Sequence, residues 1–108
     1  MKIAIASDGN SLDSKIDRCF CKCRYFMIYD TVSHESDFVR NICGYFNVNA
    51  GKSIIKMMIK HKIEMVISLQ FGINTLRNAD NSGIKTLTIN DENINMKKVI
   101  SFININKF

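Results

Sequence analysis

The chain has 108 residues, of which 46% are hydrophobic and 23% are charged, and this suits one domain, residues 1–108, with a single hydrophobic core. The formal net charge of +5 favours an acidic partner or an anionic ligand, but the cations are scattered and no aromatic-and-basic nucleic-acid signature is present. Because no signal-peptide core or membrane span is recognisable, we expect a cytoplasmic protein that binds neither nucleic acid nor membrane.

The first half of the chain predicts three strands. An apolar run from residue 2 ends at the turn residues Asp8, Gly9 and Asn10, which indicates a buried strand that delivers Asp8 to a loop. Residues 25–30 are aromatic-rich, and residues 37–43 alternate moderately. These two segments predict an antiparallel hairpin.

Helices and strands alternate in the second half of the chain. Lysines at four-residue spacing opposite an apolar face predict an amphipathic helix, and Gly83 suits the cap of a second helix. The expected elements are a helix over 50–62, a strand over 65–69, a helix that follows Gly72 and reaches Ser82, a strand over 84–90 and a last helix from residue 93.

The order βββαβαβα predicts a three-layer α/β domain, with a mixed five-stranded sheet and helices on both faces. Ligands of such sheets gather at the carboxyl ends of the strands. The loops over 8–24 and 69–74 should lie side by side there.

The first of these loops contains three of the four cysteines, Cys19, Cys21 and Cys23. Their basic neighbours favour the thiolate, which is the form that binds metal or attacks as a nucleophile. In a reducing compartment, such a cluster indicates a metal or redox site rather than a disulfide framework. A turn is needed before three alternating sulfur atoms converge on one ion.

The metal at such a site is left open by the sequence. Thiolates select zinc, copper(I) or iron-sulfur clusters, and Cys43 would complete the set of four sulfur ligands that clusters usually have. However, Cys-x-Cys-x-Cys is not one of the common zinc or ferredoxin spacings. Cysteines are also among the most buried residues, so some or all of the four have a structural alternative, Cys43 above all.

Several segments resemble the dinitrogenase iron-molybdenum cofactor biosynthesis family, which includes NifX-like carriers and the C-terminal domain of NifB. The resemblance covers essentially the whole length and depends on the order and spacing of its motifs. These are Met1-Lys-Ile-Ala-Ile-Ala, Leu12-Asp-Ser-Lys-Ile16, Phe20, Tyr25-Phe-Met-Ile-Tyr-Asp30, Ala50-Gly51, Gly72-Ile-Asn74 and Gly83-Ile-Lys85.

The chain departs from the family pattern at two loops. Ile73 and Thr75 stand where the family usually has proline and alanine, and Cys19 and Cys21 stand where it usually has the histidine and the glycine of a His-Phe-Gly-Arg loop. If that glycine adopts positive φ, Cys21 either carries a backbone penalty or the loop differs.

The resemblance implies an RNase H-like fold and a non-catalytic role in holding and passing on an iron-sulfur cluster or an iron-molybdenum-type cofactor precursor. We expect Cys19, Cys21, Cys23 and Cys43 as metal ligands, with zinc as an alternative metal. Arg18, Lys22 and Arg24 would offset the charge of the cargo, while Gly72 and Asn74 would line the facing loop. Partners would be cluster donors or acceptors, and the protein would be a monomer or a cluster-bridged dimer. The alternative function is a metal-free interaction or regulatory module with redox-responsive or structural cysteines.

Two enzyme-like interpretations are weaker. A two-metal nuclease would need clustered carboxylates, and only Asp8 and Asp30 are expected at strand ends. A phosphate-binding loop at Gly51 would need a second glycine five residues earlier, where Phe46 stands. We expect His34 to be exposed in the hairpin turn and His61 to lie near a helix end, so neither is a predicted ligand.

Overall fold

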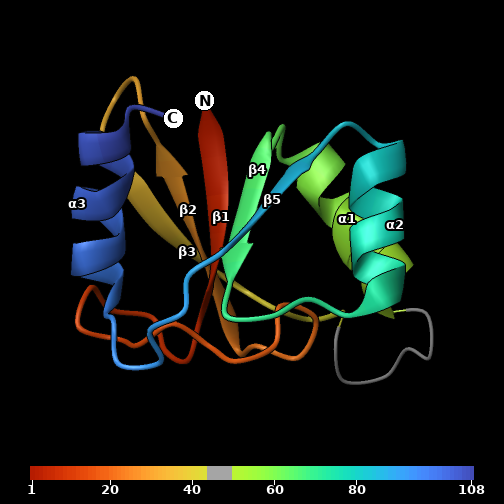
Figure 1. The fold of residues 1–108 in the computed structure, drawn as a ribbon, viewed down its shortest axis with the longest axis horizontal. Coiled ribbons are helices and arrows are strands. Elements are labelled where there is room, and N and C mark those ends of the chain that lie inside the picture. The colour runs from red at the N-terminus through yellow and green to blue at the C-terminus, as the bar shows by residue number, and fades with distance from the viewer. Residues whose placement is uncertain (44–49) are drawn as a thin grey trace.

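The computed structural model describes residues 1–43 and 50–108, and its elements follow the predicted order (Figure 1). The elements are β1 (Lys2–Ser7), β2 (Tyr25–Asp30), β3 (Ser36–Arg40), α1 (Ala50–Lys60), β4 (Met65–Ser68), α2 (Ile73–Asn81), β5 (Lys85–Thr88) and α3 (Met96–Asn106).

The strands form one mixed sheet in the order β3-β2-β1-β4-β5. β1 pairs antiparallel with β2 and parallel with β4, while β2 and β3 form the expected antiparallel hairpin. β5 adds parallel to β4 through the α2 crossover. The predicted α/β class and mixed five-stranded sheet are therefore confirmed, and the arrangement is compatible with an RNase H-like fold.

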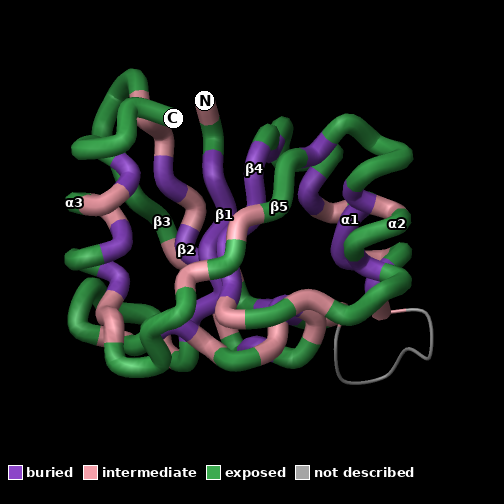
Figure 2. Tube along the Cα trace, in the orientation of Figure 1, coloured by how far each residue is buried: buried purple, intermediate pink, exposed green. Residues whose placement is uncertain are grey.

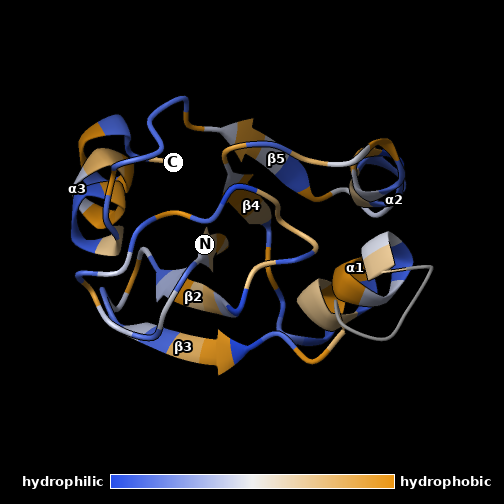
Figure 3. Cartoon of the chain, turned by 90° about the horizontal axis from the view of Figure 1, so that it is seen from below, coloured by the Kyte–Doolittle hydropathy of each residue, from blue (hydrophilic) through white to orange (hydrophobic). Residues whose placement is uncertain are grey.

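Helices cover both faces of the sheet, with α1 and α2 side by side on one face and α3 on the other (Figures 1 and 3). Successive side chains of β1 point to opposite faces of the sheet and so contribute to the core on both faces. Ala4 and Ala6 belong to one core cluster, and Ile3 and Ile5 belong to the other. The buried segments accordingly follow the central strands and the sheet-facing sides of the helices (Figure 2). The three-layer prediction is confirmed.

Most element boundaries agree with the predicted ones within two residues. The exceptions are the start of the last helix, expected from residue 93 and found at Met96, and the end of the third strand, next to the cysteines. The third strand was predicted to reach Cys43, but β3 ends at Arg40. The chain turns there because the side chain of Asn41 is buried and forms hydrogen bonds with a neighbouring loop. Cys43 therefore lies beyond the strand and not at its end.

The helix ends have recognisable caps. Gly83 follows α2 with φ of +72°, which confirms its predicted role, since glycine adopts this conformation without steric cost. Asn95 caps α3 by accepting a hydrogen bond from the Lys98 amide at 2.9 Å. None of the helices in residues 1–43 and 50–108 is long and apolar enough to cross a membrane.

Candidate functional site

The loops after β1 and β4 lie side by side, as the sheet order predicted. Cys19 forms an isolated parallel bridge with Gln70. The Gln70 amide donates a hydrogen bond to the Arg18 carbonyl at 3.1 Å, and the Phe20 and Phe71 rings pack with centroids 5.3 Å apart. These contacts fix the thiol loop, residues 18–24, against the start of α2.

Cys21 is the partly buried thiol at this junction. Its Sγ lies 2.6 Å from the Thr75 hydroxyl in the first turn of α2. Burial raises the pKa of Cys21, and the neighbouring Cys19 raises it as well, whereas the Thr75 hydrogen bond and the Lys22 charge lower it. Lys22 therefore favours the thiolate, as expected of a basic neighbour, but desolvation outweighs it and the pKa of Cys21 is raised.

Thr75 is held in place by a close approach of two helices. A Cβ atom on Gly51 would lie 2.9 Å from Thr75 Oγ1 and 3.1 Å from the Thr75 amide nitrogen. Only a glycine fits at this contact without a shift of its neighbours. Gly51 therefore serves helix packing, and the first turns of α1 and α2 meet beside Cys21.

Cys23 belongs to the core and not to the surface of the loop. Its side chain is 0% exposed and packs in the cluster between the sheet and helices α1 and α2. Its Sγ donates a hydrogen bond to the Phe20 carbonyl at 3.3 Å. Burial raises the pKa of Cys23 strongly, and the nearby Asp17 adds to the effect. In this arrangement the sulfur is protonated and inaccessible.

Asn41 connects the thiol loop to the segment that follows β3. Its side-chain amide donates to the carbonyls of Cys21 and Cys23, each at 2.9 Å, and its Oδ1 accepts from the Cys43 amide at 3.0 Å. Cys43 itself is partly buried and packs against the same core cluster as Cys21. One buried polar side chain thus orders three of the four cysteine backbones.

The backbone of the thiol loop contains no left-handed cysteine. Among the described non-glycine residues, only His34, Lys62 and Lys107 have positive φ. Cys21 is therefore accommodated at the position of the family's glycine without the backbone penalty that positive φ would impose.

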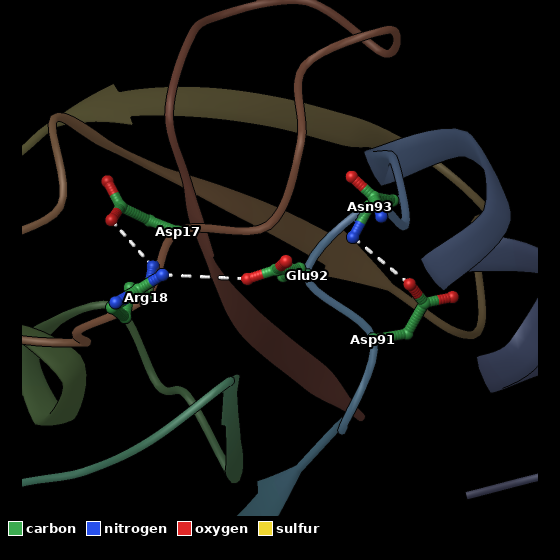
Figure 4. A network of polar contacts seen from close by, with 5 residues as sticks. All are labelled: Asp17, Arg18, Asp91, Glu92 and Asn93. Atoms are coloured by element: carbon green, nitrogen blue, oxygen red, sulfur yellow. Dashed lines mark hydrogen bonds and ion pairs between the residues drawn. The ribbon is translucent and has the colours of Figure 1, made fainter.

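The predicted cationic residues are all exposed, and one of them contacts an acidic residue. Arg18 Nη2 is 3.5 Å from Glu92 Oε2, and both side chains are largely exposed (Figure 4). Lys22 and Arg24 are also exposed. Of the three, Arg18 is the one whose charge is directed toward an acidic neighbour.

Acidic residues are missing from the sequence segments that surround Cys21. No Asp or Glu occurs in residues 18–29, 38–63 or 65–79. The exposed side chains at this end include Lys22, Arg24, Arg40 and Lys52. The surroundings of Cys21 therefore favour negative charge.

Gly72 and Asn74 lie where the facing loop enters α2. Gly72 is the residue that precedes the helix, and Asn74 lies in its first turn with its carbonyl accepting from the Asn78 side chain at 2.7 Å. Both residues are exposed. Thr75, which follows them, provides the contact with Cys21.

The predicted nuclease carboxylates do not meet. Asp30 pairs with Lys2 at the start of β1, whereas Asp8 follows the end of β1, so about 20 Å of strand separates them. Asp30 caps the hairpin turn by accepting from the Val32 amide at 2.8 Å. The structure therefore gives the nuclease interpretation no support.

Both histidines lie at the end of the sheet opposite the thiol loop. His34 lies in the exposed hairpin turn, as predicted, and its Nδ1 is 2.9 Å from the Tyr29 hydroxyl. His61 follows α1 and lines a pocket of about 530 Å³ together with Lys2 and Asp30. In the described residues, no three His, Cys, Asp or Glu side chains come together as a group that could hold a metal ion.

Sequence reasoning missed two residues that organise the site, Asn41 and Thr75. Asn41 gives no signal, because an isolated asparagine after a strand is ordinary. Thr75 gives one, since both Thr75 and Cys21 depart from the family pattern and the structure places them in contact. Two departures far apart in the chain would have suggested such a contact.

Comparisons with solved structures identify several proteins of the same fold. The apo form of the orange protein from Desulfovibrio gigas has 18% identity and a TM-score of 0.88, covering 98% of this chain and 88% of that chain. A candidate NifB protein from Thermotoga has 23% identity and a TM-score of 0.82, with 98% and 89% covered. A candidate dinitrogenase from Methanocaldococcus jannaschii has 22% identity and a TM-score of 0.63, with 99% and 90% covered.

A search of curated protein sequences finds no match. The family model described as dinitrogenase iron-molybdenum cofactor matches residues 1–101, which is nearly the whole chain and includes the thiol loop, Asn41 and Thr75. The chain therefore belongs to the dinitrogenase iron-molybdenum cofactor family.

Proposed function

We propose that the protein binds and carries an iron-sulfur cluster or a metallocofactor intermediate through the thiol loop, in an accessory role without catalysis. The contact between Cys21 and Thr75 at the junction of α1 and α2 carries this proposal. The hydrogen bond to Thr75 orders the Cys21 thiol, which remains partly exposed and is not sealed in the core. A second partly exposed thiol, Cys19, lies in the same loop.

The donor chemistry fits such a cargo. Thiolates prefer iron-sulfur clusters, zinc or copper(I) over hard cations. Cys19, Cys21 and Cys43 are each partly exposed, whereas Cys23 would reach a metal only if its part of the loop opened. Cys43 lies outside the thiol loop, and no three potential ligands come together in the described residues. We therefore assign Cys19 and Cys21 as the ligands, Cys23 as a structural residue, and no ligand role to Cys43.

The charge around the site supports an anionic cargo. A thiolate-ligated cluster is negative, and the nearest cations, Lys22 and Arg24, are exposed without an acidic residue in their own segment. Arg18 would join them by leaving its long, solvent-exposed contact with Glu92.

The geometry also suits exchange. A carrier has to release its cargo, and a surface loop with partly exposed ligands allows a second protein to approach the metal. The buried Cys23 and Asn41 would keep the loop ordered while the cargo is absent. We expect binding to be labile to air, since thiolate ligands at the surface are open to oxidation.

Metal and sulfide analysis tests this function. Wild-type protein and Cys21→Ser, both purified and reconstituted without oxygen, are compared for iron, sulfide and zinc per chain, with Cys43→Ser as the matched control. We expect iron and sulfide in the wild type and in the control, and their loss in Cys21→Ser. Wild-type protein that takes up neither would contradict the proposal, and zinc alone would indicate a different type of site.

The alternative function, a metal-free module with structural or redox-responsive cysteines, is favoured by one observation. Cys23 is completely buried, as a structural cysteine would be. Thiol titration separates the two functions, because a loaded loop protects Cys19 and Cys21 until the metal is removed. In a metal-free module these two thiols react to the same extent before and after treatment with a chelator.

A further inference from the structure

One chain supplies only part of a cluster-binding site. All four cysteines and both histidines are among the described residues. Cys23 is sealed in the core, and the histidines lie at the other end of the sheet. Within residues 1–43 and 50–108, no three potential ligands gather around one point. The accessible pair in the thiol loop is therefore a half-site.

The two thiols of this half-site lie close together. Cys19 and Cys21 are two residues apart in one short loop that is held on both sides, by the Gln70 bridge and by Thr75. Each is partly exposed. Iron-sulfur clusters usually require four cysteine ligands, twice what this pair provides.

We propose that a second copy of this chain completes the site, so that one cluster is held between two chains by Cys19 and Cys21 of each. This inference rests on the proposed function and names the partner in it. The two copies are related by a two-fold axis, because identical loops meet across the cluster.

The charge distribution at this end of the molecule suits such a dimer. The first part of the β1–β2 connection lies beside α3, and together with the segment before α3 it is acidic, whereas the side next to α1 and α2 is basic. A two-fold axis between these halves places the acidic half of one copy over the basic half of the other. The acidic half contains Asp8, Asp13, Asp17, Asp91 and Glu92, and the basic half contains Lys22, Arg24, Arg40 and Lys52.

Assembly of the shared cluster needs no change of oxidation state when ferric iron is supplied. Two ferric ions, two sulfide ions and four cysteine thiols give a two-iron cluster with four thiolate ligands and release four protons. Four iron-sulfur bonds form to the protein as four S–H bonds break. The product has two negative charges, which the lysines and arginines of both chains offset.

Native mass spectrometry and sedimentation, both without oxygen, test the inference with ferric iron and sulfide as the probe. We expect the apo protein to be a monomer and the loaded protein to be a dimer with two irons and two sulfides per pair of chains. Cys19→Ser and Cys21→Ser should each remain monomeric without a cluster. Cys43→Ser, the matched control, should form the loaded dimer.

The possible failures are distinguishable. A cluster bound to a single chain would overturn the shared site and leave the proposed function intact. Loss of the cluster in Cys43→Ser would overturn the assignment of the four ligands. Failure of the wild type to take up iron and sulfide would contradict both the dimer and the proposed function.

Discussion

The two parts of the connection between β1 and β2 are built differently. Residues 8–17 are polar and mostly exposed, and their backbone is tied to the sheet and to α3, for example by the Ile16 amide to Ile94 and the Met96 amide to Ser14, at 2.9 and 2.8 Å. Residues 18–24 bury Phe20 and Cys23 completely.

The two parts differ in what holds them. Backbone hydrogen bonds do not depend on side-chain identity, so the exposed non-glycine positions of residues 8–17 should tolerate substitution, unlike the buried Ile16. The thiol loop depends on two side chains from elsewhere in the chain, Asn41 and Thr75. A loop ordered in this way can keep unusual surface residues such as thiols in place, but single changes outside it should disturb it.

The largest expected effect is that of Asn41→Ala. The change leaves the carbonyls of Cys21 and Cys23 without this donor and the Cys43 amide without this acceptor, and should lower the free energy of unfolding by about 3 kcal/mol. Urea denaturation measures it. Asn81→Ala, at an exposed position, is the control and should change it by less than about 0.5 kcal/mol. Equal effects of the two substitutions would contradict the role of Asn41.

Cys23→Ala should lower the free energy of unfolding by about 1 to 2 kcal/mol at neutral pH, because it removes a buried side chain. In the wild type, the folded state keeps the Cys23 proton above the ordinary thiol pKa of 9.0, whereas the unfolded state loses it. Wild-type stability should therefore fall as pH rises above this value.

The difference in stability between wild type and Cys23→Ala should consequently shrink between neutral pH and the alkaline range. Denaturant unfolding at a series of pH values measures this difference. A constant difference across the series would show that Cys23 has no raised pKa in the folded protein. If Cys23→Ala were as stable as the wild type at neutral pH, this would contradict the burial of Cys23 in the core.

The fold was largely predictable from the sequence, since apolar periodicity and turn residues mark each element and βαβ connectivity limits the order of the strands. The thiol loop was also recognisable. The sequence could not rank its thiols, because Cys21 and Cys23 occupy positions of the same parity in a strand pattern. The turn over residues 20–22, which the structure shows, gives them different environments. Asn41 and Thr75 come from distant segments, and their contacts arise only in the tertiary structure.

Thr75→Val should change reactivity more than stability. It removes the hydroxyl beside Cys21 Sγ and should raise the pKa of this thiol further. Loss of one hydrogen bond of about 1 kcal/mol corresponds to about fivefold slower alkylation at a fixed pH below the pKa. Thr75→Ser retains the hydroxyl and should react as the wild type does. Identical rates for all three proteins would contradict the contact.

The smallest effect is expected in the polar part of the connection. Asp8→Ala removes one exposed hydrogen bond, from the Lys15 amide to Asp8 Oδ1 at 2.9 Å, while the backbone bond from the Asp8 amide to the Lys15 carbonyl remains. The free energy of unfolding should fall by about 0.5 to 1 kcal/mol. A loss as large as that of Asn41→Ala would remove the contrast between the two parts.

Residue-resolved alkylation of loaded and chelator-treated protein tests cargo binding by the thiol loop most directly. Protein reconstituted with iron and sulfide is treated with an alkylating reagent without oxygen, and each cysteine is quantified by mass spectrometry. We predict that Cys19 and Cys21 are protected in the loaded protein and react after chelation, while Cys23 stays unreactive in both. Equal alkylation of Cys19 and Cys21 before and after chelation would contradict the account.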